Sequence, residues 1–164
     1  MARLEQVVDW QVAATPEGVW AKLADYERWP EWWQGIESVT LLRRGQDDGV
    51  GSVLHQRWRS RLPLTLSFDL EMLRVERPRL LEGRAAGDLE GTCTWTISEE
   101  PGGCRVGFRV DVRTARWWMS LPLPFADHIF RANFDTVMGW GRDGLERALT
   151  TRRPEVAGDE VPAG

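Results

Sequence analysis

The stretch DHIFRANFDTVMGWGRDGLERALT, residues 127–150, decides how the rest of the chain has to fold. Its apolar side chains recur at steps of three and four residues, which predicts one long helix with a single apolar stripe. Such a stripe is stable in water only when it packs against another apolar surface. The members of the stripe are Phe130, Phe134, Val137, Met138, Gly141, Leu145 and Leu149.

Most of the chain before this helix shows the alternation of apolar and polar residues that is typical of half-buried strands. The clearest case is LPLTLSFDLEMLRV, residues 62–75, where every second side chain from Leu62 to Met72 is apolar. Tight turns rich in Gly, Asp and Pro separate the later strands, which predicts an antiparallel meander. The other predicted strands are 4–14, 38–45, 50–60, 80–86, 88–98 and 104–114.

Two short helices are predicted between the first and second strands. Thr15-Pro16-Glu17 supplies an N-cap, a proline at the first helical position and an acid in the first turn. Pro30 ends or restarts this helix, so a second short helix holds Trp32 and Trp33, and Gly35 closes it.

The order of these elements gives an α+β fold class: a seven-stranded curved antiparallel sheet wrapped around a long C-terminal helix, with two short helices after the first strand. A twisted sheet and a helix curve differently, so we expect a hollow between them. Residues 1–150 are predicted to form one domain. Residues 151–164 are polar and rich in Pro and Gly, so we expect a disordered tail.

The bulk composition excludes several classes of partner. The chain has 164 residues and a net charge of −4, which does not suggest the basic face on which nucleic-acid binding depends. No window of about 18 residues is apolar enough for a transmembrane helix, and the N-terminus lacks the apolar core of a signal peptide. We therefore expect a cytoplasmic protein with neither a nucleic-acid partner nor integral membrane association.

The sequence does not indicate a metal or a cofactor. Its two cysteines, Cys93 and Cys104, and its two histidines, His55 and His128, have no metal-ligand spacing. The two cysteines would not face each other on a hairpin that turns near residues 101–103, so we expect free thiols.

Three stretches resemble the START-like (SRPBCC) superfamily: TPEGVWAKLADYERWPEWW (15–33), RLLEGRAAGDLEGTCTW (79–95) and FRANFDTVMGWGRDGLERAL (130–149). Together they are similar to its bacterial polyketide cyclase/dehydrase-type branch. The superfamily includes pollen-allergen-like ligand carriers and polyketide aromatase/cyclases. The resemblance implies a helix-grip fold with an internal cavity between the long helix and the concave sheet, closed at one end by the two short helices. It does not settle the chemistry, because one fold supports many functions.

Such a cavity suggests a role for the tryptophans of DYERWPEWWQGI, residues 25–36. Trp29, Trp32 and Trp33 would either wall the mouth of the cavity or plug the end of the core, and for Trp29 we favour the core. Adjacent residues on a helix point about 100° apart. Trp32 and Trp33 therefore cannot both face inward equally, and we expect one of them at the surface or the mouth.

We expect the cavity to be lined mainly by apolar side chains from the sheet and the long helix. Burial of apolar ligand surface would drive binding at about 25 cal/mol per Å², and Gln56, Ser60 or a backbone group would orient the ligand. The predicted lining is Trp33, Gln56, Trp58, Ser60, Phe68, Leu70, Trp95, Phe108, Phe130, Phe134, Val137 and Met138.

The strand around Trp58 bears on whether the protein is a carrier or an enzyme. If Trp58 and Gln56 face inward, then His55, Arg57 and Arg59 face outward. The resemblance to the cyclase branch implies an inward arginine that polarises the polyketide. In this phase, with Trp58 and Gln56 inward, no arginine of this strand qualifies, unless a bulge near Pro63 rotates one of them inward. The opposite phase would bury His55, Arg57 and Arg59 together with no acid nearby in sequence to offset their desolvation.

Three glycines in the long helix allow two interpretations. Gly139, Gly141 and Gly144 each cost about 1 kcal/mol relative to alanine. They indicate either tight packing against the sheet or room for a ligand, and the sequence favours neither.

Three functions follow from these patterns. The first is binding of a small hydrophobic molecule, lipid- or polyketide-like, in the cavity; whether the protein is a homodimer is left open. The second is an aromatase/cyclase or dehydratase that acts on a polyketide-like substrate, with catalytic residues unassigned. The third is a protein- or membrane-interaction module that uses the apolar segment ARWWMSLPLPF, residues 115–125. A charged, desolvated side chain near the centre of the cavity would favour the enzyme, and an apolar cavity would favour the carrier.

Overall fold

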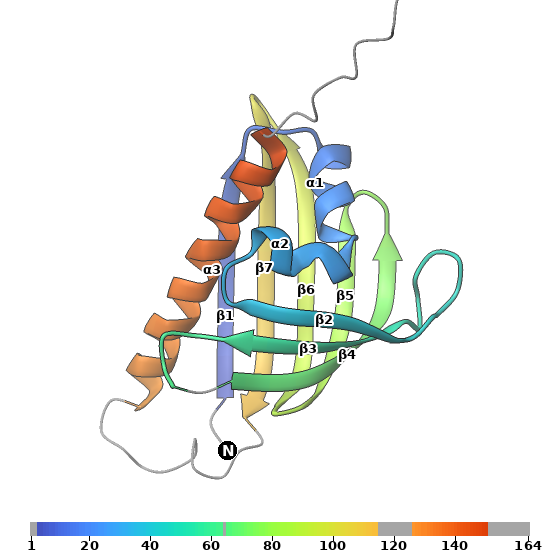
Figure 1. Ribbon diagram of the computed structural model, residues 1–164. Helices are drawn as coiled ribbons and strands as arrows, with labels where there is room; N and C mark the ends of the chain where they lie inside the picture. Colours follow the sequence, from blue (N-terminus) through green and yellow to red (C-terminus); the bar gives the residue numbers. More distant parts are fainter. Residues whose placement is uncertain (1–2, 64, 115–125, 151–164) are drawn as a thin grey trace, which may run out of the picture.

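The structure is a computed structural model that describes residues 3–63, 65–114 and 126–150 (Figure 1). The predicted tail at 151–164 and the segment 115–125 lie outside these residues. All seven predicted strands and the long helix are present. In chain order the elements are β1 (Arg3–Val12), α1 (Pro16–Leu23), the 3₁₀ helix η1 (Tyr26–Arg28), α2 (Trp29–Trp32), β2 (Ile36–Arg43), β3 (Val53–Arg59), β4 (Thr65–Glu76), β5 (Leu80–Gly87), β6 (Leu89–Glu100), β7 (Gly103–Thr114) and α3 (Ala126–Thr150).

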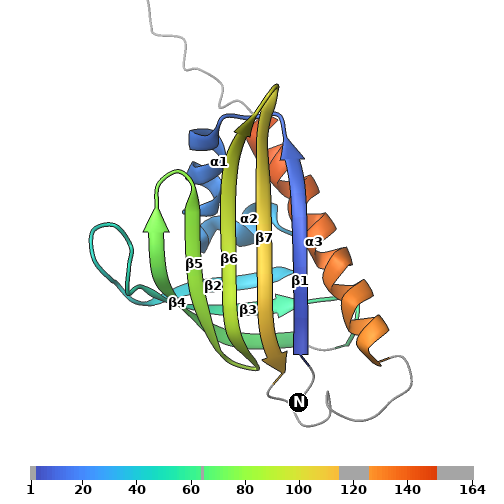
Figure 2. The same cartoon turned by 180° about the vertical axis from the view of Figure 1, so that it is seen from behind.

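The strands form one antiparallel sheet in the order β1-β7-β6-β5-β4-β3-β2. Strands β2 to β7 are the predicted meander, and the last of them, β7, pairs with the first strand of the chain, β1. Register shifts interrupt the β2–β3 and β4–β5 pairings, and such bulges bend a sheet and increase its twist. Figures 1 and 2 show this bending: β2, β3 and β4 run across the direction of β1, β6 and β7. The sheet is therefore strongly curved, as predicted.

Two glycines permit sharp distortions near the β5–β6 hairpin. Gly87 has a φ of 131° and Gly91 a φ of 148°, which side chains other than glycine rarely tolerate. A Cβ at Gly91 would also overlap the backbone of Asp111 on the neighbouring strand β7. Glycines with this geometry are typical of turns and bulges in a curved sheet.

The first short helix begins as predicted, and the second ends one residue early. The Thr15 hydroxyl accepts a hydrogen bond from the Gly18 amide at 3.1 Å, which caps α1. Helix α2 ends at Trp32, and Trp33 follows it with extended backbone dihedrals of −106° and 101°. The prediction that Trp33 lies within the helix is therefore wrong. The 100° relation between adjacent helical residues does not govern this pair.

Helix α3 lies along the concave side of the sheet beside β1 (Figure 1) and packs against α1, α2 and β1. A Cβ at Gly141 would overlap the Trp33 indole, and one at Gly144 would overlap the Trp32 carbonyl oxygen. A Cβ at Gly139 would meet no atom within 4 Å. The packing interpretation thus holds for Gly141 and Gly144, which let α3 approach the end of α2.

Trp33 is the centre of an aromatic core. Its side chain has no solvent exposure, and its Nε1 donates a hydrogen bond to the Val137 carbonyl of α3 at 2.9 Å. Buried indoles are stable when this single donor is satisfied. Its ring lies between 5.2 and 5.8 Å, centroid to centroid, from those of Trp10, Trp29, Trp32, Trp58 and Trp95.

Both cysteines are free, as predicted. Among the described residues, no group of three or more His, Cys, Asp or Glu side chains could hold a metal ion. No helix in the described part of the chain is both long and apolar enough to cross a membrane.

Candidate ligand-binding cavity

A cavity of about 130 Å³ lies between α3 and the concave face of the sheet. Its walls are mainly aromatic and aliphatic. Ten of the predicted lining residues border it. That any of them contacts a ligand stays a prediction. The ten are Gln56, Trp58, Ser60, Phe68, Leu70, Trp95, Phe108, Phe130, Phe134 and Val137.

The remaining two predicted residues, Trp33 and Met138, do not border the cavity; both are buried in the core. Trp33 is displaced because α2 ends before it, and its indole turns to the backbone of α3 instead. Trp29, which we assigned to the core, is buried and also borders the cavity. The core assignment of Trp29 therefore holds, and Trp29 rather than Trp33 also contributes to the cavity wall.

Of the two possible orientations of strand β3, the structure has the one that places Gln56 in the cavity wall. Leu54 and Gln56 are each 1% exposed, whereas Arg57 and Arg59 lie on the outer face and pair with Glu37 at 3.7 and 3.0 Å. Arg59 also touches the cavity, but its side chain is 70% exposed, so it belongs to the rim. No arginine of β3 is desolvated inside.

The polar groups of the cavity include two side-chain amides. The Gln56 Oε1 accepts a hydrogen bond from the Trp58 Nε1 at 2.7 Å. The Gln56 Nε2 and the Asn133 Oδ1 are buried and have no hydrogen-bond partner in the described part of the chain. Asn133 lies on α3, so the unpaired amide atoms come from both walls of the cavity.

The titratable groups of the cavity do not suit acid–base chemistry. The described lining residues include no Asp, Glu or His, and the ionisable ones are Arg3, Arg59, Arg131 and Cys93. Burial raises the pKa of the Cys93 thiol to about 12, so this group is a neutral thiol near pH 7 rather than a nucleophilic thiolate. A general base would need a pKa near the working pH, and the described lining supplies none.

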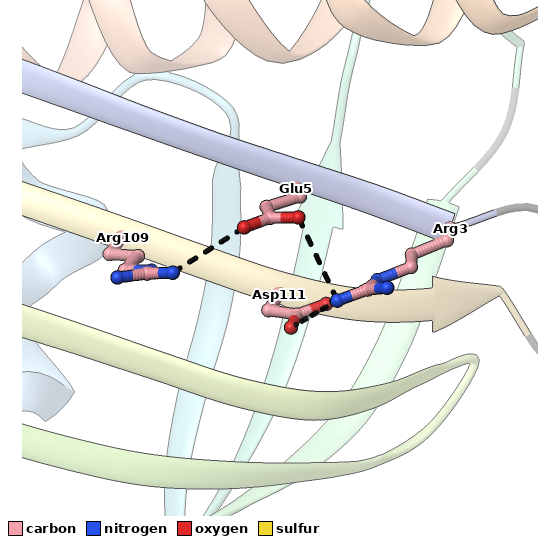
Figure 3. Close-up of polar contacts among 4 residues, drawn as sticks. All are labelled: Arg3, Glu5, Arg109 and Asp111. Carbon is pink, nitrogen blue, oxygen red and sulfur yellow. Dashed lines mark hydrogen bonds and ion pairs between the residues drawn. The ribbon is translucent and has the colours of Figure 1, made fainter.

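Arg3 sits at the rim and is held by acids on the outer face of β1 and β7 (Figure 3). Its guanidinium donates two hydrogen bonds to the Asp111 carboxylate at 2.9 and 2.8 Å. These bonds lower the pKa of Asp111. Glu5 lies 3.7 Å from Arg3 and 3.4 Å from Arg109. The network is solvent-exposed, so it contributes little to stability and leaves Arg3 engaged outside the cavity.

Some cavity residues were missed although the sequence pattern contained them. Val110 and Val112 share the inward face of β7 with Phe108, which the alternation in residues 104–114 already indicated. Asn133 had a weaker signal, since it lies three residues after Phe130 and next to Phe134 on the helix. Its exposure to the cavity depends on how α3 is rotated against the sheet.

A curved seven-stranded antiparallel sheet around a C-terminal helix, with an apolar cavity between them, defines the class of START-like helix-grip proteins. The family model described as "Polyketide cyclase / dehydrase and lipid transport" matches residues 1–150, and the chain belongs to this family.

Solved structures support the fold at low sequence identity. The Zhui aromatase/cyclase from Streptomyces sp. R1128 has a TM-score of 0.70 and 19% identity over 96% of this chain and 98% of that one. A START superfamily protein from Mycobacterium smegmatis has a TM-score of 0.68 and 18% identity over 90% and 96%. The di-domain aromatase/cyclase BexL of the BE-7585A biosynthetic pathway has a TM-score of 0.73 and 14% identity over 92% of this chain. The match spans about half, 51%, of the BexL chain. No curated protein sequence matches significantly.

Proposed function

We propose that the protein binds a small hydrophobic molecule in the cavity between α3 and the sheet. The observation that carries this proposal is a cavity of about 130 Å³ whose walls are mainly aromatic and aliphatic. Sites of this kind, apolar with a few polar groups, are typical for small-molecule binding. The family to which the chain belongs is described by polyketide and lipid chemistry, which fits an apolar ligand.

The size of the cavity limits the ligand. A volume of 130 Å³ is comparable to an apolar cavity of about 150 Å³ that accepts benzene, and smaller than the roughly 300–1,000 Å³ of sites for larger ligands. One ring therefore fits the cavity as it stands. It would be a complete ligand or the terminal ring of a larger lipid- or polyketide-like molecule, and the larger molecule would require the walls to move apart.

The affinity expected for a single ring is modest. Burying roughly 200 Å² of aromatic surface contributes about 5 kcal/mol, and part of this is offset by the loss of translational and rotational freedom. A dissociation constant near 1 mM corresponds to about −4 kcal/mol. A method that detects weak binding is therefore appropriate.

The alternative functions have less support. The aromatase/cyclase reading draws on the family and on the likeness of fold, whereas the described lining offers no acidic or imidazole side chain for proton transfer. The interaction module rests on residues 115–125, which lie outside the described residues. Ligand binding is the function that the described geometry supports best.

The test is a titration of the protein with toluene, followed by ¹H–¹⁵N NMR. We expect saturable shifts that include the indole N–H signals of Trp29 and Trp58, which border the cavity. Val110→Phe fills the cavity and should abolish these shifts. The matched control is Val7→Phe on the outer face of β1, where the side chain is 63% exposed. The proposal fails if wild type shows no saturable shifts, or if Val110→Phe and Val7→Phe bind toluene equally well.

A further inference from the structure

We propose that the natural ligand carries a hydrogen-bond acceptor oxygen, which takes an N–H of the Gln56 side-chain amide. This inference rests on the proposed function and narrows the ligand from any apolar molecule to a neutral ring-bearing molecule with a carbonyl, ether or hydroxyl oxygen. The observations that carry it are the burial of Gln56, its contact with Trp58 and its unpaired amide nitrogen.

Trp58 fixes which end of the Gln56 amide is free. The oxygen and nitrogen of a glutamine amide are hard to distinguish by shape, so their assignment depends on the hydrogen-bond partners. The Trp58 Nε1 is only a donor, and it lies 2.7 Å from the Gln56 Oε1. The oxygen must therefore face Trp58, and the amide nitrogen with its two N–H groups is left for another partner. Trp58 acts here as a positioning residue.

The free nitrogen is costly without a partner. Gln56 is 1% exposed, and its Nε2 makes no hydrogen bond to any described residue. A buried donor without a partner costs about 1–3 kcal/mol, and nearly all buried polar groups in native proteins have one. Gln56 borders the cavity, so an acceptor on the ligand would remove this cost.

The opposite wall provides a second polar contact. The Asn133 Oδ1 on α3 is also buried without a partner among the described residues, and Asn133 borders the same cavity. This amide oxygen can accept a hydrogen bond from a ligand. The arginines that border the cavity, Arg3, Arg59 and Arg131, are solvent-exposed, and burial keeps Cys93 a neutral thiol with a pKa of about 12. A neutral ligand with one acceptor toward β3 and a second polar substituent toward α3 fits both walls.

The experiment compares probes that differ only in polarity. Toluene and phenol have equal numbers of non-hydrogen atoms, as do ethylbenzene and anisole, so each pair exchanges an apolar group for an oxygen of similar size. Dissociation constants are measured by NMR for wild type and for Gln56→Met, which keeps the side-chain length and removes the amide. We expect Gln56→Met to weaken phenol relative to toluene, and anisole relative to ethylbenzene, by about 2- to 10-fold, the range of a neutral hydrogen bond.

Toluene is the internal control, because a variant that misfolds loses toluene as well as phenol. For that case a second measurement uses wild type alone: the side-chain ¹⁵N–¹H signals of Gln56 should shift with phenol and anisole and stay unmoved by ethylbenzene at equal occupancy. If toluene binds wild type but Gln56→Met changes the dissociation constants of both members of each pair equally, the inference is overturned and the proposed function stands. This result is expected if an internal water, rather than the ligand, accepts the hydrogen bond of the amide. The inference is also overturned if the oxygen probes leave the Gln56 signals unmoved. If toluene itself does not bind wild type, the proposed function fails and this inference fails with it.

Discussion

The approach of Gly141 to Trp33 yields opposite expectations for the same substitution at two nearby positions of α3. Replacing glycine by alanine in a helix gains about 1 kcal/mol from propensity alone. At Gly139 an added Cβ meets no atom within 4 Å, so Gly139→Ala should realise most of this gain. For a chain of this length, about 1 kcal/mol corresponds to a rise in Tm of about 2–4 °C.

At Gly141 the same methyl group would overlap the indole of Trp33. This ring cannot shift at low cost, because it is fully buried among other tryptophans and its Nε1 is bonded to the Val137 carbonyl. Overpacking of this kind costs about 1–3 kcal/mol, and loss of the buried N–H bond adds about 1–3 kcal/mol. After the propensity gain is subtracted, Gly141→Ala should destabilise the protein by roughly 1–5 kcal/mol.

The assay is urea unfolding followed by circular dichroism, which gives the midpoint and the slope for each variant. Gly139→Ala should move the midpoint up and Gly141→Ala should move it down, with similar slopes. The Trp33 indole N–H signal should shift only in Gly141→Ala. If the two variants prove equally stable, or Gly141→Ala the more stable, then the packing of α3 against Trp33 is not as described.

Three further predictions concern individual titratable groups. Burial raises the pKa of Tyr26, the single tyrosine, above the value of about 10 in an unfolded chain. The stability that the neutral Tyr26 side chain supports is therefore complete below about pH 10 and lost as the pH rises above it. Absorbance at 295 nm should show tyrosinate only as the protein unfolds, not before. The Arg3 contact lowers the pKa of Asp111, so the contribution of this ion pair to stability is present above about pH 3.9 and lost in acid. Asp111→Asn should slightly lower the urea midpoint at neutral pH. An equal effect of this substitution in acid would contradict the prediction. The Cys93 thiol, with a pKa of about 12, should react with Ellman's reagent only after unfolding, so rapid labelling of the native protein would count against its burial.

The class of fold and part of the cavity wall follow from the sequence because both depend on local periodicity. Side chains alternate across a strand with a period of two, so the pattern around Phe108 and Val110 already indicated which side chains face inward. The three- and four-residue steps of α3 in the same way indicated that Phe134 and Val137 face the sheet. A one-residue error in the bounds of such an element leaves its faces unchanged.

Contacts between distant elements are different, because no local pattern encodes them. Trp29 and Trp33 are both buried in the core, but Trp33 does not border the cavity as we expected, because its indole turns to the Val137 carbonyl of α3. Gly139 and Gly141 look alike in sequence and differ only in what lies opposite.

The sequence by itself determined the elements and the faces they bury, since those depend on backbone geometry within a few residues. Only the tertiary structure decided that Trp33 reaches Val137, 104 positions away, and that the side-chain amide nitrogen of Gln56 finds no partner among the described residues. Both outcomes depend on how side chains of separate elements fill a shared volume, which the order of residues along one element does not specify.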